Sequence, residues 1–102
     1  MERKLKKLLK KLTIDAIENA SKAEDSGNEL EMAFYIGAFD IYNMINISLE
    51  KGYDKYHIHK LLTSLGLETS ARQYEVQSIK AERYEDGRAS AIATMLSELR
   101  RK

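Results

Sequence analysis

Proline is absent from this chain of 102 residues, and only five glycines interrupt it. Because proline is the residue that breaks helices most strongly, nothing in the sequence prevents long helices. Apolar residues recur at helical spacing, whereas the valine, isoleucine and threonine alternation of half-buried strands is missing. The sequence therefore predicts an all-α protein.

Two helices are predicted in the first half of the chain, about residues 3–25 and 29–51. The intervening segment Ser26-Gly27-Asn28 breaks the apolar pattern. Asn28 with Glu31 three positions later fits a capping pair at the start of the second helix. Gly52 fits the left-handed position that follows a helix end.

Two further helices are predicted in the second half, about residues 54–65 and 70–100. Asp54 fits the N-cap of the shorter one, which Gly66 would end. Ser70 with Gln73 fits the start of the longer one. Asp86-Gly87 is a turn-forming pair inside that pattern, and we expect one helix to continue through it rather than two shorter ones.

Short connections favour antiparallel neighbours. These helices therefore predict one domain over residues 1–102, an antiparallel up-and-down bundle of three long helices and one short helix. Gly37 and Gly87 each precede an apolar helical face. The simplest interpretation is that both glycines let two helices approach closely, and an internal duplication is the alternative.

Residues that carry catalysis or hold cofactors are scarce. The chain has no cysteine, and its two histidines, His57 and His59, would point about 200° apart on a helix, so they cannot hold one metal ion from the same face. Glycine-rich phosphate loops are absent. We expect a protein that is not an enzyme, with no cofactor and no metal.

The apolar runs are too short for a membrane span. The longest, Met32 to Phe39, falls far below the ~20 residues that cross a bilayer. Lysines interrupt every apolar run of Met1 to Leu12, where a secretion signal would need a continuous one. Together with the absence of cysteine, this predicts a cytoplasmic protein without a transmembrane segment.

The N-terminal segment is a basic amphipathic sequence. Residues 1–12 hold six basic residues and one acidic residue, whereas residues 13–50 hold one basic and eight acidic. In the predicted bundle, the start of the first helix, the end of the second and the end of the fourth meet at one pole. That pole would gather Arg3, Lys4, Lys7, Lys51, Arg100, Arg101 and Lys102. A protein partner, a polyanion or an anionic membrane surface could bind there, although a solvated surface is the alternative.

A second candidate surface lies at residues 58–74. Its pattern of helix, Leu65-Gly66-Leu67 turn and polar helix start resembles a helix-turn-helix DNA-binding motif. The resemblance implies that Thr69, Ser70, Arg72 and Gln73 open a recognition helix. Leu62 and Arg72 depart from the motif, because the first position is usually small and the second usually aliphatic.

The helix over 29–51 carries apolar residues on several faces. Four of the eight aromatic residues of the chain fall within it: Phe34, Tyr35, Phe39 and Tyr42. One core should hardly absorb them all, and aromatic residues are enriched at interfaces. We therefore predict self-association as a homodimer through this helix.

These observations favour a non-enzymatic protein that binds another macromolecule, in particular a protein, as an oligomeric adaptor or inhibitor. The alternative is a helix-turn-helix transcriptional regulator, which would bind duplex DNA with a steep salt dependence.

Overall fold

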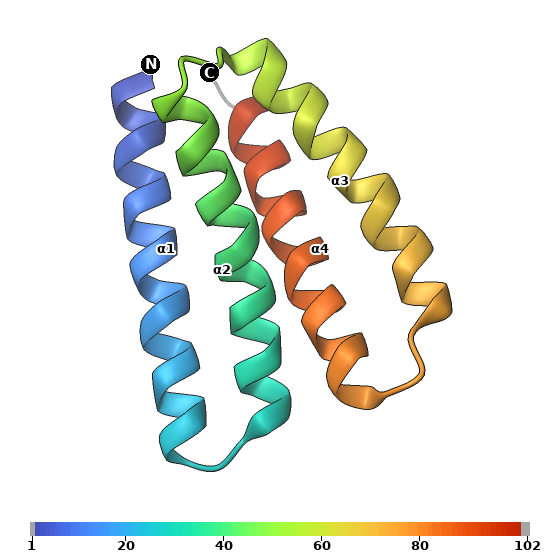
Figure 1. Cartoon of the computed structure of the whole chain (residues 1–102). Coiled ribbons are helices and arrows are strands. Elements are labelled where there is room, and N and C mark those ends of the chain that lie inside the picture. The colour runs from blue at the N-terminus through green and yellow to red at the C-terminus, as the bar shows by residue number, and fades with distance from the viewer. Residues whose placement is uncertain (1, 101–102) are drawn as a thin grey trace.

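The computed structural model describes residues 2–100, and 90% of them are helical. There are four helices in this part of the chain, shown in Figure 1: α1 Glu2–Asp25, α2 Glu29–Glu50, α3 Lys55–Glu75 and α4 Ile79–Arg100. No strand occurs among the described residues. The prediction of an all-α protein is confirmed.

The predicted boundaries of the first two helices are close to the observed ones. The Asn28 side chain accepts a hydrogen bond from the Glu31 amide at 3.1 Å, and it donates one to the Glu31 carboxylate at 3.2 Å. This is the predicted capping pair. Gly52 has a φ of +91°, so it takes the left-handed conformation expected after the end of α2.

In the second half, Asp54 caps the start of α3 and α4 passes through Asp86-Gly87 to Arg100, as predicted, but the predicted break between these two helices is wrong. α3 continues through Gly66 and Ser70 to Glu75, so there is no short helix, and the break lies instead at residues 76–78. There the Ser78 hydroxyl accepts a hydrogen bond from the Ala81 amide. An interior glycine costs a helix only about 1 kcal/mol relative to alanine, and Leu62, Leu65 and Thr69 keep one buried face across it. The predicted stop at Gly66 was therefore too weak to end the helix.

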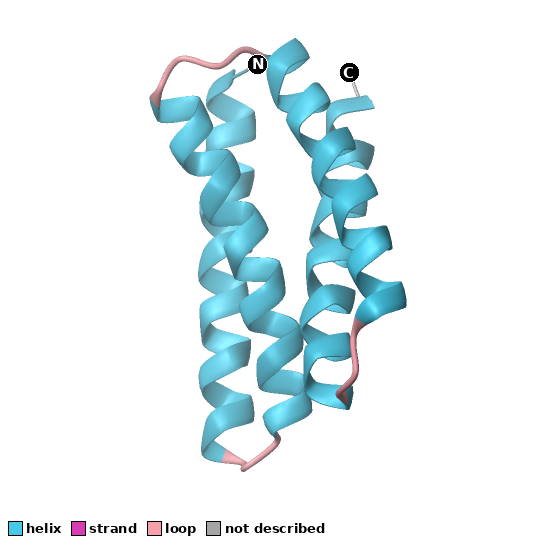
Figure 2. Cartoon of the chain, turned by 45° about the vertical axis from the view of Figure 1, so that its right-hand side comes forward, coloured by secondary structure: helices cyan, strands magenta, loops and turns pink. Residues whose placement is uncertain are grey.

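The four helices form two hairpins, α1–α2 and α3–α4, which Figure 2 shows as two pairs. Within each hairpin the helices run in opposite directions (Figure 1). The most extensive contact joins α2 and α4, which run in the same direction, while α1 packs on α2 and α3 packs on α4. The predicted bundle has only antiparallel neighbours, so it differs from the structure at this central contact, where α2 and α4 are parallel.

Gly37 and Gly87 lie where α2 and α4 approach each other. A Cβ atom at Gly37 would collide with the Tyr84 carbonyl oxygen, and a Cβ atom at Gly87 would collide with the Phe34 carbonyl oxygen. The interpretation that these glycines permit close helix approach is confirmed.

The central helix of the second hairpin repeats the burial pattern of α2, whereas, among residues 3–100, no buried residue of α1 lies 50 positions before a buried residue of α3. Six of the seven buried residues of α4 lie 50 positions after a buried residue of α2, as in the pairs Ile45/Met95 and Leu49/Leu99. The ends of the helices follow the same offset, since Asp25 and Glu75 end the outer helices and Glu50 and Arg100 the central ones. This equivalence supports the internal duplication that the glycine spacing left open.

The core runs between the two central helices and is closed by one outer helix on each side. Its largest fully buried apolar side chains come from all four helices: Leu9, Ile41, Ile45, Ile58, Leu62 and Met95. Within the described part of the chain, no helix has the combination of length and apolar character needed to cross a membrane.

Candidate binding surfaces

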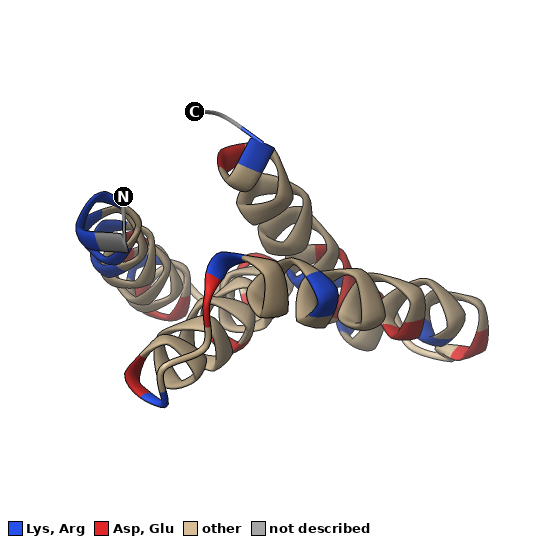
Figure 3. Cartoon of the chain, turned by 90° about the horizontal axis from the view of Figure 1, so that it is seen from above, with Lys and Arg blue, Asp and Glu red and all other residues tan. Residues whose placement is uncertain are grey.

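The starts of α1 and α3 and the ends of α2 and α4 lie at the same end of the molecule (Figure 1). We call it the basic end, and it takes in residues 3–12, 41–62 and 91–100. Of the predicted pole, Arg3, Lys4, Lys7, Lys51 and Arg100 are exposed there. Figure 3 looks down on this end and shows Lys and Arg at the start of α1 and at the end of α4. Arg101 and Lys102 lie outside the described residues.

The first half of α1 has a basic outer face and an apolar inner face. Its six cations are all exposed, and none forms an ion pair with a residue in the range 3–100: Arg3, Lys4, Lys6, Lys7, Lys10 and Lys11. On the inner face, Leu9 is fully buried, and Leu5 and Leu12 pack against the core. These leucines hold the fold together, so only the cations are available to a partner.

The opposite end, which we call the acidic end, takes in residues 13–40 and 63–90. Among residues 3–100, the basic end holds ten basic and three acidic residues, whereas the acidic end holds five basic and twelve acidic. The two ends therefore carry about +7 and −7 at neutral pH. The sequence indicated segregated charge only in residues 1–50. The acidic residues of the second hairpin can be assigned to this end only once α3 is known to end at Glu75.

The predicted recognition helix does not exist. Thr69, Ser70, Arg72 and Gln73 lie inside α3 and not at a helix start. Thr69 is 1% exposed, Arg72 pairs with Glu68 at 3.0 Å, and Gln73 donates a hydrogen bond to Asp86 at 3.0 Å. The predicted turn at Gly66 is helical because the buried face of α3 is continuous across it. The helix-turn-helix geometry is therefore wrong.

The four aromatic residues of α2 make contacts within the chain. Tyr42 is buried in the core, and Phe39 packs against it. Phe34 and Tyr35 are half-buried and meet edge to face, with the Arg83 guanidinium 4.6 Å from the centre of the Phe34 ring. One chain thus absorbs much of the aromatic surface that suggested a homodimer. The homodimer itself stays a prediction.

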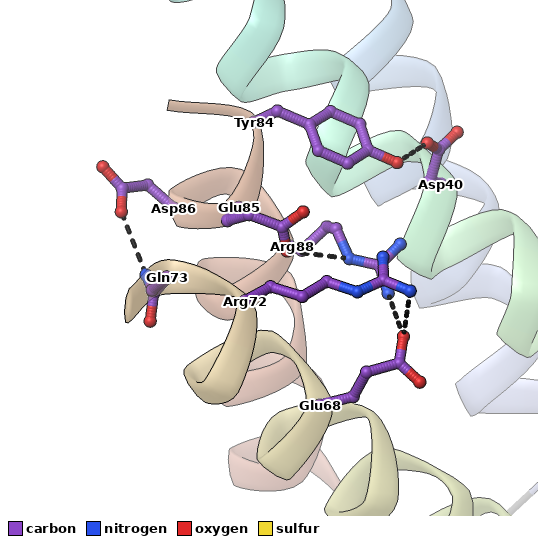
Figure 4. Close-up of polar contacts among 8 residues, drawn as sticks. All are labelled: Asp40, Glu68, Arg72, Gln73, Tyr84, Glu85, Asp86 and Arg88. Atoms are coloured by element: carbon purple, nitrogen blue, oxygen red, sulfur yellow. Dashed lines mark hydrogen bonds and ion pairs between the residues drawn. The ribbon is translucent and has the colours of Figure 1, made fainter. Parts of the chain in front are cut away.

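A buried polar cluster, which the sequence did not predict, joins α3 and α4 (Figure 4). Arg88, only 4% exposed, pairs with Glu85 at 3.5 Å and with Glu68 at 3.6 Å. Glu85 is also buried, whereas Glu68 is half-exposed and pairs with Arg72. The i, i+3 spacing of Glu85 and Arg88 was the available signal, although such pairs usually lie on a surface. The two arginines of the cluster neutralise its two glutamates. We therefore assign the cluster a structural role.

A second polar contact joins the central helices. The Tyr84 hydroxyl donates a hydrogen bond to the Asp40 carboxylate (Figure 4). Desolvation first, and then this hydrogen bond, raise the pKa of Tyr84. Desolvation also raises the pKa of Tyr42.

These two shifts predict a stability that falls in alkaline solution. A raised pKa means that the folded state favours the protonated tyrosine, so the contribution is complete below the unfolded pKa of about 10 and is lost as the pH rises through the folded value. An absorbance titration at 295 nm should show two of the six tyrosines ionising late. Tyr42→Phe and Tyr84→Phe should each remove one late step. Six steps at one pH would contradict the prediction.

Both ends also expose apolar side chains. At the basic end, Tyr53 and Tyr56 are 45% and 65% exposed. At the acidic end, an open groove of about 410 Å³ runs between the starts of α2 and α4, and its apolar lining includes Ala33, Ile36 and Ala81. Ile79, which begins α4, is 68% exposed at the same end.

The two histidines are exposed. His57 lies 2.7 Å from the Asp54 carboxylate, which also accepts the His57 amide and so caps α3. These bonds to His57 lower the pKa of Asp54. Among the described side chains, no group of three or more His, Asp or Glu residues could hold a metal ion.

Comparison of the chain with protein-family models, with curated proteins and with solved structures finds no match.

Proposed function

We propose that this chain is a non-enzymatic binding protein that docks an acidic surface of a protein partner through its basic end. The observation that carries the proposal is the placement of six exposed cations on the outer face of α1, which form no ion pair with residues 3–100. Cations in the first turn of a helix oppose its dipole and cost about 0.3–1 kcal/mol each at low ionic strength. Local stability therefore does not account for Arg3 and Lys4, whereas an acidic partner does.

The buried leucines of α1 favour a protein partner over a lipid surface. A helix that lies on a membrane inserts its apolar face among the acyl chains. Here that face is occupied by the core, with Leu9 fully buried. A role as adaptor or inhibitor then requires only that the basic end occupies a partner's acidic site.

Reversing three charges on α1 tests the proposal. We expect Lys4→Glu, Lys6→Glu and Lys7→Glu together to abolish capture of the acidic partner from the native cell. The melting temperature should stay the same or rise slightly, because carboxylates suit the first turns of a helix. Lys22→Glu, an exposed lysine in the last turn of α1, is the control and should leave capture unchanged.

Two outcomes would overturn the proposal. One is equal capture by the wild type and the triple variant. The other is capture that disappears on nuclease treatment and is reproduced by random duplex DNA with a steep salt dependence, which would make nucleic acid the partner.

A further inference from the structure

The acidic end offers an apolar groove surrounded by negative charge, and the basic end of the same chain has the complementary properties. The groove is lined by the apolar side chains of Ala33, Ile36 and Ala81 and by Ser78, Tyr84, Glu85 and one cation, Lys80. Exposed carboxylates stand at the same end: Glu24, Asp25, Glu29, Glu75 and Glu82. An occupant should therefore combine positive charge with exposed apolar or aromatic side chains.

We propose that the occupant of this groove is the basic end of a second copy, so that chains associate head to tail. Tyr53 and Tyr56 are exposed at the basic end, beside the exposed Lys51 and Lys60. The charges of the two ends, about +7 and −7, are nearly equal in size. Complementary potentials of this kind steer association and fix its orientation.

The inference goes beyond the proposed function, because it assigns a role to the acidic end. Head-to-tail contact is heterologous, which means that each copy uses two different surfaces and the assembly stays open unless its rotation closes a ring. A copy bound at the basic end would also exclude the acidic partner from it.

The outer helix α1 supports the inference through the placement of its charges. Cations occupy its first turns, and in its last turn the acidic Glu24 and Asp25 outnumber the single basic residue, Lys22. Both groups oppose the helix dipole, so the charge pattern of α1 is the reverse of the one that stabilises a helix. Glu75 stands in the same unfavourable position at the end of α3. Such a pattern separates charge along the molecule, at a cost to local stability.

The test uses two charge-reversed variants of the full chain. The first, Lys4→Glu, Lys6→Glu and Lys7→Glu, brings the basic end from about +7 to +1. The second, Glu24→Lys, Asp25→Lys and Glu75→Lys, brings the acidic end from about −7 to −1. Lys4→Glu and the three changes at the acidic end improve the match to the helix dipoles, and Lys6 and Lys7 are exposed, so both variants should fold. Helical circular dichroism verifies this.

Sedimentation equilibrium measures the association. We expect the wild type at low salt to exceed its monomer mass of 11.7 kDa and to keep growing with concentration. At 1 M salt, where the Debye length is about 3 Å, it should return to the monomer. Each variant alone should bind itself at least tenfold more weakly. An equimolar mixture should form dimers and nothing larger, because only one complementary pair of ends remains.

A second pair of substitutions tests the apolar part of the contact. Tyr56→Ser should weaken association severalfold. Leu67→Ser removes a similarly exposed side chain from the middle of α3 and should leave association unchanged.

The proposal fails if the wild type stays monomeric at low salt, or if the variant mixture associates no better than the separate variants. It also fails if association is insensitive to salt and is abolished by Tyr35→Lys with Phe39→Lys, which would indicate the twofold dimer through α2. The acidic-end variant retains the whole basic end. Its capture of the acidic partner therefore tests the proposed function independently.

Discussion

Replacing Gly87 with alanine is expected to lower the free energy of unfolding by about 3 kcal/mol, the upper end of the usual range for overpacking. The added Cβ atom would meet the Phe34 carbonyl and its neighbouring backbone atoms, which are not the movable end of a side chain. The two central helices must separate to admit it, and the core between them loosens. Gly37→Ala should have a similar effect, because its Cβ atom would meet the Tyr84 carbonyl.

Gly66→Ala is the matched control for these two substitutions. At Gly66 a Cβ atom would lie 3.6 Å from the Ile92 Cγ2 atom, an ordinary van der Waals distance. Replacing an interior helical glycine there should raise stability by about 0.5–1 kcal/mol. Urea unfolding followed by circular dichroism measures all three variants. Equal effects at Gly66 and Gly87 would show that helix propensity, and not close approach of α2 and α4, decides the outcome.

The contrast between these glycines also explains which parts of the fold could be predicted. The first hairpin has strong local signals, since Asn28 caps α2 through its own side chain and Gly52 needs a positive φ. In the second hairpin, Gly66 and Ser70 imitate the same signals inside a helix whose buried face is continuous. Local sequence does not distinguish a glycine that ends a helix from a glycine inside a helix whose buried face continues on both sides of it.

The candidate surfaces also differ in how far the sequence alone predicts them. The exposed cations of α1 follow from helical spacing alone, because the leucines between them must face the core. The acidic end, in contrast, needs the topology, since it combines the end of α1 with the end of α3. The recognition helix was wrong for a reason of burial: Thr69 faces the core, and Arg72 and Gln73 bind neighbouring carboxylates.

The buried cluster around Arg88 gives the second large expected effect. Arg88→Met should lower the free energy of unfolding by about 3–5 kcal/mol, because it leaves the Glu85 carboxylate buried without its partner. Glu68 keeps Arg72 at 3.0 Å and should add little to the loss. Urea unfolding at low temperature is the measurement, since a loss of this size is a large part of a small domain's stability.

The double variant Glu85→Leu with Arg88→Met separates the charge effect from packing. Replacing a buried ion pair with apolar groups of similar volume is often neutral or stabilising, so the double variant should recover most of the loss. The first hairpin supports this expectation, because Tyr35 and Ala38 occupy the positions equivalent to Glu85 and Arg88, 50 residues earlier, without any charge. A double variant as unstable as Arg88→Met alone would mean that the aliphatic stem of Arg88 fills the α3–α4 contact and that its charge is incidental. Recovery would instead show that the attraction between Glu85 and Arg88 only offsets the cost of burying their charges, and that α3 packs on α4 without the pair.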